Sequence, residues 1–120
     1  MKVRCIKITN PHSGRDESPR DSWFTVGKEY LVLEIYLDPA NKRSMYRIEA
    51  DNGVTPVLTT ITDFVIVSGD IPSSWVAMQT DEMITFGPSA WMQPGFWEAF
   101  FDRDDNMGKI YKQEKIKMNI

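Results

Sequence analysis

Carboxylate side chains gather late in the chain, at a spacing that could support acid–base or metal chemistry. Glu98 and Asp102 stand four residues apart, so on a helix they would share one face. Asp104 and Asp105 follow directly. The segment that starts at Asp102 lacks the glycine at the sixth position and the glutamate at the twelfth that a calcium loop needs. We therefore expect this carboxylate density to serve the binding of a partner.

Nucleophiles and metal ligands are few in this chain. Its one histidine, His12, lies in a stretch rich in Pro, Gly and Ser near Asp16 and Glu17, which indicates a solvated loop residue. Its one cysteine, Cys5, stands in a β-branched run, where a small core residue is expected. One imidazole and one thiol cannot build the usual zinc site, and no glycine-rich phosphate loop is present. We expect no enzyme, no metal and no cofactor.

Length and composition predict one folded domain. A chain of 120 residues fits a single domain, 1–120, and can bury a core without disulfides. Hydrophobic residues make up 42%, which is typical of folded proteins rather than disordered ones. The first residues contain no apolar run before a cleavage site, and no segment approaches the roughly 18 apolar residues of a membrane span. We expect a cytoplasmic protein that does not enter a membrane.

Charge is distributed unevenly along the chain. Residues 21–105 carry five basic and fourteen acidic side chains, a net charge of −9. Residues 1–20 and 106–120 each carry a net charge of +3. An acidic body repels phosphate backbones and attracts basic protein surfaces, so we expect no nucleic-acid partner. The alternative is that the acidity serves solubility alone.

Short β-rich runs separated by turn residues predict five strands before residue 70. The run 44–50 alternates apolar and polar residues, with Arg47 on the polar side, as in a strand with one buried face. Asn52 and Gly53 predict a type I′ hairpin turn, which needs positive φ at both positions. We expect an SH3-like, strongly bent antiparallel barrel over about 2–68. Its strands would be 2–9, 29–36, 44–50, 54–59 and 64–67.

The remaining segment, 71–120, predicts a packed extension with a short helix, so the class is mainly β with some α. Residues 81–86 indicate a further strand, and 96–102 place apolar side chains on one helical face. Residues 109–118 fit either a helix or a last strand. The aromatic residues expected to pack this segment on the barrel are Trp75, Trp91, Phe96, Phe101 and, mostly buried, Trp97 and Phe100.

Three stretches carry a family resemblance: Trp23–Leu33 (WFTVGKEYLVL), Ile71–Trp75 (IPSSW) and Gly87–Glu98 (GPSAWMQPGFWE). Together they resemble small immunity proteins of bacterial polymorphic toxin systems, including contact-dependent growth inhibition. The resemblance covers most of residues 23–102. It implies a protein that binds and neutralises a cognate toxin domain, commonly a nuclease, in the cytoplasm.

The acidic body and the resemblance together predict the partner and the contact surface. A nuclease presents a basic substrate cleft, which an acidic inhibitor can cover without any catalytic group. The residues expected to bind the toxin are Glu98, Asp102, Asp104 and Asp105, with Trp91 as an aromatic anchor and Asp16 and Glu17 as a second contact.

Two other functions stay open at this point. The first is an SH3-like module that binds a protein or peptide in a regulatory role, for example one encoded by a phage. The second is a small barrel that binds nucleic acid through its basic ends. That function requires seven cations to converge on one face: Lys2, Arg4, Lys7, Lys109, Lys112, Lys115 and Lys117. A small-molecule ligand is not expected.

Overall fold

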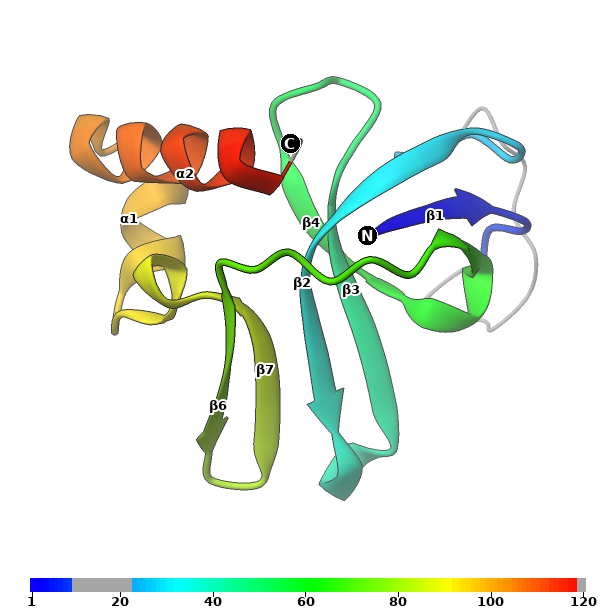
Figure 1. The fold of residues 1–120 in the computed structure, drawn as a ribbon, viewed down its shortest axis with the longest axis horizontal. Helices are drawn as coiled ribbons and strands as arrows, with labels where there is room; N and C mark the ends of the chain where they lie inside the picture. Colours follow the sequence, from blue (N-terminus) through cyan, green and yellow to red (C-terminus); the bar gives the residue numbers. More distant parts are fainter. Residues whose placement is uncertain (10–22, 119–120) are drawn as a thin grey trace.

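A computed structural model describes residues 1–9 and 23–118 of the chain. In these ranges the protein is mainly β, as expected, with seven antiparallel strands and two helices near the C-terminus (Figure 1). The strands are β1 (Lys2–Cys5), β2 (Glu29–Asp38), β3 (Arg43–Glu49), β4 (Pro56–Thr60), β5 (Phe64–Ser68), β6 (Trp75–Thr80) and β7 (Met83–Pro88). The helices are α1 (Phe96–Phe101) and α2 (Asp105–Met118), and a short 3-10 helix, η4 (Ser89–Met92), precedes them.

The long strand β2 organises the sheet. One edge of β2 pairs with β3 along most of its length. The other edge is shared, because its first half pairs with β1 and its second half pairs with β7. A register shift between Val32 and Glu34 separates the two halves. Such a bulge bends the strand, so β2 serves a barrel-like lobe at its start and a flatter sheet with the β6–β7 hairpin at its end.

The first core fills the lobe around β1, the start of β2 and β5. Val3, Cys5 and Val32 are almost fully buried there, and Phe24, Tyr30 and Phe64 pack edge to face beside them. Cys5 is 1% exposed, which confirms it as a core residue, and this burial raises the pKa of its thiol.

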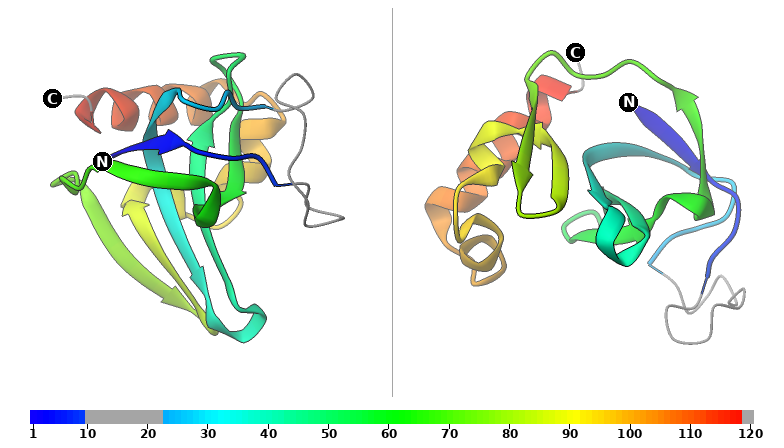
Figure 2. Two further views of the ribbon diagram at one scale, coloured as in Figure 1. Left: turned by 90° about the vertical axis from the view of Figure 1, so that its right-hand side faces the viewer. Right: turned by 90° about the horizontal axis from the view of Figure 1, so that it is seen from below.

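The expected barrel over 2–68 does not close. Within the described residues, β5 pairs only with β1 and β6 pairs only with β7, which leaves β4, β5 and β6 as sheet edges. The views in Figure 2 show the open, curved sheet with the helices to one side. The segment after residue 70 is part of the sheet, because β7 takes the place beside β2 that a closing strand would need.

The second core lies between the sheet and the helices. Trp91 is 1% exposed and stacks on Tyr111, with 5.2 Å between ring centroids, and on Phe96 at 6.4 Å. Leu33 and Met118 complete this core. Trp97 and Phe100 pack against it but are only half-buried, so the expectation that they are mostly buried is met in part.

Local geometry explains where the expected elements differ from the observed ones. Residues 109–118 are helical, within α2, whose start is capped by the Asp104 carboxylate accepting the Met107 N–H at 3.1 Å. The turn after β3 is not of type I′, because Gly53 has φ +76° whereas Asn52 does not have positive φ. Instead, the Asn52 side chain accepts the N–H groups of Val54 and Thr55.

Two strands depart most clearly from the expected ones. β1 ends at Cys5 rather than at residue 9, because the N–H groups of Ile6 and Lys7 both point to the Asp63 carbonyl. β6 was not expected as a strand at all.

Among the helices that the structure describes, none has the length and apolar character needed to cross a membrane.

Candidate functional site

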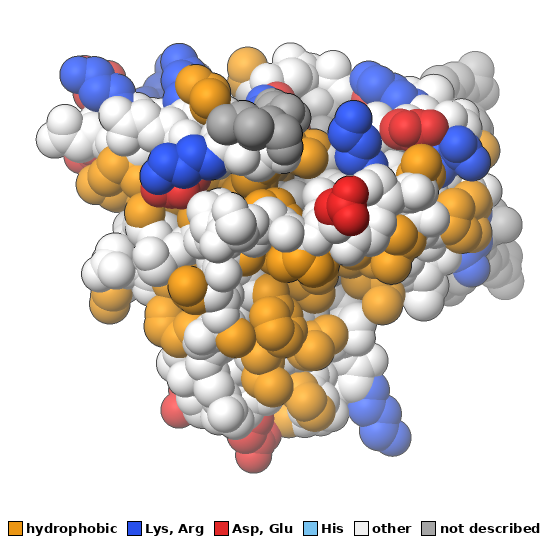
Figure 3. Space-filling model, in the orientation of Figure 1, with side chains coloured by type: hydrophobic (Ala, Val, Ile, Leu, Met, Phe, Trp, Pro, Cys, Tyr) orange, Lys and Arg blue, Asp and Glu red, His pale blue; other side chains and the backbone are white. Residues whose placement is uncertain are grey.

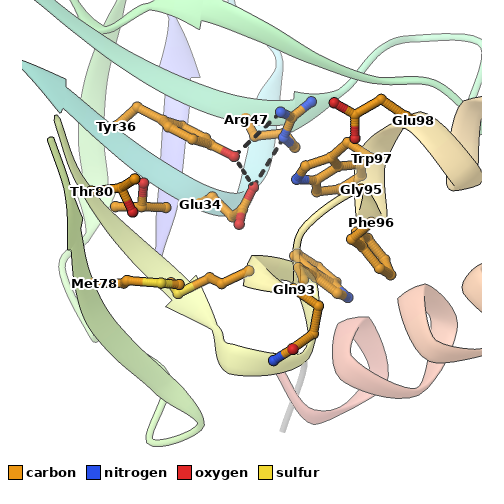
Figure 4. A pocket seen from close by; sticks show the side chains of 13 residues that line it. Glu34, Tyr36, Arg47, Met78, Thr80, Gln93, Gly95, Phe96, Trp97 and Glu98 are labelled. Atoms are coloured by element: carbon orange, nitrogen blue, oxygen red, sulfur yellow. Dashed lines mark hydrogen bonds and ion pairs between the residues drawn. The ribbon is translucent and has the colours of Figure 1, made fainter.

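A pocket of about 350 Å³ opens on the face of the sheet that carries the helices. Its walls come from β2 and β3, from the β6–β7 hairpin, and from the segment that links η4 to α1 (Figure 4). This segment turns sharply at Gly95, whose φ of +78° is one that side-chain-bearing residues rarely adopt. The turn starts α1 directly over the polar side of the sheet.

A buried ion pair forms the floor of this pocket. Glu34 on β2 and Arg47 on β3 are 0% and 7% exposed. Arg47 Nε donates to Glu34 Oε1 at 3.0 Å, and the Tyr36 hydroxyl donates to the same oxygen at 2.6 Å. The guanidinium also donates to the Tyr36 hydroxyl at 3.3 Å and to the Pro56 carbonyl at 3.4 Å. The network thus holds Arg47 and one carboxylate oxygen in place.

The second oxygen of Glu34 has no hydrogen-bond partner. Oε2 is buried on the side of the carboxylate away from Arg47, and it faces β7, where a Cβ atom on Gly87 would come within 3.2 Å of it (Figure 4). Burial raises the pKa of Glu34, while the Tyr36 hydrogen bond and the charge of Arg47 oppose that rise. The Trp97 indole N–H points toward this carboxylate and also opposes the rise of its pKa, but it falls short of hydrogen-bond geometry. An unsatisfied carboxylate oxygen in a buried site costs free energy, so its retention invites a functional explanation.

Trp97 and Glu98 form the helical wall. The Arg47 guanidinium carbon lies 3.9 Å from the centroid of the Trp97 ring, a close cation–π contact. Glu98 is the next residue of α1, is exposed, and lines the pocket rim. The expected acidic residue Glu98 is therefore brought next to a buried ion pair that we did not expect.

The four expected acidic residues lie at one corner, along α1 and the start of α2. All are exposed, and within residues 1–9 and 23–118 no ion pair joins any of them to a cation. Asp102 ends α1, with its N–H donated to the Glu98 carbonyl at 3.0 Å, and Arg103 turns the chain with φ +64°. Asp104 caps α2, so it has a structural task as well as a charge. The corner carries Glu98, Asp102, Asp104 and Asp105.

The other residues expected to bind the toxin are not found at this corner of the surface. Trp91 is a central residue of the second core, so at 1% exposure it offers almost no surface to a partner. Asp16 and Glu17 lie outside the described residues, as does His12.

Sequence reasoning missed Glu34, Tyr36 and Arg47. A signal was present, because Glu34 interrupts the apolar run of β2 and Arg47 stands on the polar side of β3. The two residues are cross-strand partners in the observed register. Opposite charges at paired strand positions can mark a buried pair when another element covers that face.

Among the residues that the structure describes, no group of three or more His, Cys, Asp or Glu side chains is placed to hold a metal ion. No family model, no curated protein and no solved structure matches this chain.

Proposed function

We propose that this protein is an immunity protein that binds a bacterial toxin domain, a nuclease, and blocks its basic active-site region in the cytoplasm. The observation that carries the proposal is the corner of four exposed carboxylates without ion-pair partners among the described residues. The corner consists of Glu98, Asp102, Asp104 and Asp105.

The electrostatics of this acidic corner suit a basic protein surface. Unpaired carboxylates at a surface gain little from internal contacts, so their field is available to steer a basic partner. Three of the seven basic side chains near the described chain ends are held in ion pairs, which weakens the competing field. Arg4 is paired with Glu29 at 3.0 Å, Lys115 with Glu49 at 2.8 Å, and Lys117 with Glu114 at 3.1 Å. These pairs weaken the case for a nucleic-acid partner.

A second candidate function is an SH3-like module that binds a peptide. It is favoured by the open side of the sheet, where β5 is an edge strand with exposed apolar side chains. Figure 3 shows apolar side chains gathered on this face of the molecule. An exposed sheet edge can accept an extended peptide as an added strand. The exposed apolar residues of β5 and of the segment that follows it are Val65, Ile66, Val67 and Ile71.

One binding experiment separates these two functions. A nuclease toxin domain that co-purifies with this protein from its native host is purified, and its association is measured by stopped flow at several salt concentrations. We expect Asp102→Lys/Asp105→Lys to slow association at least about tenfold at low salt and to flatten the salt dependence. Asp104 is left unchanged because it caps α2. Growth protection against the toxin is measured in parallel.

The matched control is Asp70→Lys/Glu82→Lys, which reverses two exposed charges away from this corner. This control should bind as the unmodified protein does. Equal association rates for the two double variants would contradict the assignment of the acidic corner. Loss of binding in Ile66→Glu alone would favour the edge of β5 and the second function.

A further inference from the structure

The pocket beside the acidic corner has a buried carboxylate oxygen without a hydrogen-bond partner at its floor. Glu34 is 0% exposed, its Oε1 accepts from Arg47 and Tyr36, and its Oε2 accepts from nothing within the described residues. Glu34 lines the cavity between the β6–β7 hairpin and α1, and its Oε2 lies just beneath that cavity, against β7 (Figure 4). A buried acceptor of this kind is satisfied when a donor enters from outside.

The charges that line the pocket favour a cation. Its charged side chains are Glu34, Arg47 and Glu98. Arg47 neutralises one carboxylate at 3.0 Å, and Glu98 stands at the rim without an ion-pair partner in the described ranges. The pocket thus carries one excess negative charge, and a ligand with one positive charge would balance it.

The arrangement of acceptors favours an ammonium over a guanidinium. A guanidinium binds a carboxylate best through two parallel hydrogen bonds, which need both oxygens. At Glu34 the first oxygen is already occupied by Arg47 Nε and the Tyr36 hydroxyl. What remains is one carboxylate oxygen and the hydroxyls of Thr80 and Thr85. Separate acceptors of this kind suit the three freely rotating donors of an ammonium group.

We propose that this pocket receives the ammonium group of a lysine side chain from the partner, with Glu34 Oε2 as its acceptor and Glu98 at the entrance. The proposal rests on the proposed function, because a partner bound at the acidic corner would lie next to the pocket entrance. Oε2 is buried, so neighbouring side chains must move to admit the lysine. Met78 and Met92 line the same pocket, and unbranched thioether side chains rearrange easily.

The test uses a small mimic and needs no toxin. The ¹⁵N-labelled full-length protein is titrated with n-butylammonium chloride, and the indole N–H signals of Trp91 and Trp97 are followed by NMR. Parallel titrations use n-butylguanidinium and n-butanol. We expect n-butylammonium to shift the Trp97 signal saturably in the millimolar range, as suits so small a ligand. The guanidinium should bind at least about fivefold more weakly, and butanol should produce no saturable shift.

Variants assign the shift to the pocket. Glu34→Gln should weaken n-butylammonium binding at least about tenfold, the loss expected for a charged hydrogen bond. Thr85→Val removes a hydroxyl without touching the ion pair, and it should weaken n-butylammonium binding severalfold. This variant keeps the proposal testable where Glu34→Gln does not fold. Glu98→Gln should weaken binding less, and Glu82→Gln, an exposed acid at the hairpin turn, should leave it unchanged.

The outcomes are distinct from those of the toxin experiment. Absence of a saturable Trp97 shift, or equal binding of n-butylammonium and butanol, would overturn the lysine pocket and leave the acidic corner untouched. Tighter binding of n-butylguanidinium would overturn the choice of lysine. A saturable shift that is lost in Thr85→Val supports the pocket even where the toxin experiment fails.

Discussion

Gly87 on β7 lies directly against the buried Glu34 on β2. A Cβ atom built on Gly87 would stand 2.7 Å from Glu34 Cγ and 3.2 Å from Glu34 Oε2. The absence of a side chain at this position therefore allows β7 to pair beside β2 while a carboxylate fills the space between them. The pocket floor depends on one glycine that shows no unusual φ.

Gly87→Ala should therefore lower stability. The contact is with the Cβ and Cγ of a buried, hydrogen-bonded side chain, which cannot move without breaking its bonds to Arg47 and Tyr36. We expect a loss of about 1–3 kcal/mol in the free energy of unfolding, the range for overpacked cores. Urea denaturation followed by Trp fluorescence measures it.

Gly69→Ala is the control for this prediction. Its added methyl would meet only Ile66 Cγ2 at 3.9 Å, an ordinary contact. This variant should be neutral or slightly stabilising, because alanine restricts the unfolded chain. Equal stability for the two variants would show that Glu34 moves freely.

The Glu34–Arg47 pair should behave as a coupled unit. Arg47→Met leaves the Glu34 carboxylate buried without its cation and should cost about 3–5 kcal/mol. Adding Glu34→Leu removes the stranded charge, so the double variant should be more stable than the sum of the single losses predicts. We expect a coupling of about 1–3 kcal/mol in a double-mutant cycle. Additive losses would contradict a buried, mutually dependent pair.

The sequence predicts the elements whose pattern is local. The apolar run of β2 is found as expected, with two residues more at its end. By contrast, β6 has no clear buried face, because its residues are half-buried or exposed, and its place is set by pairing with β7. Residues 109–118 have mixed charges and few apolar residues, so their helix depends on packing through Tyr111 and on the Asp104 cap.

In the candidate site, too, some features follow from the local sequence and others only from tertiary packing. Glu98 is predictable because its spacing from Asp102 is helical and local. The sequence pattern of residues 44–50 puts Arg47 on the polar side of its strand, the side that would ordinarily face water. That face is covered instead by α1, about 50 residues later in the sequence, whose Trp97 ring lies on the guanidinium. No local pattern contains this information, so the buried pair emerges only from the tertiary fold.

The last prediction concerns the tyrosines, which should resist ionisation in the folded protein. Burial raises the pKa of Tyr30 to about 12 and that of Tyr36 to about 12, and the Asp51 and Glu34 carboxylates reinforce these rises. Burial also raises the pKa of Tyr46, and burial and Glu49 raise that of Tyr111. In the unfolded chain the same phenols ionise near pH 10. The phenolate absorbance of the native protein should therefore appear well above the pH at which the urea-unfolded protein titrates.

The sign of the accompanying stability change follows from proton binding. Between about pH 10 and 12 the folded state holds phenol protons that the unfolded state has lost, so the free energy of unfolding falls as the pH rises through this window. Below about pH 10 both states are protonated and the contribution is complete. Tyr36→Phe removes one of these groups and should make the fall shallower. A native titration centred near pH 10, with stability independent of pH up to 12, would contradict the buried hydrogen bonds of Tyr30 and Tyr36.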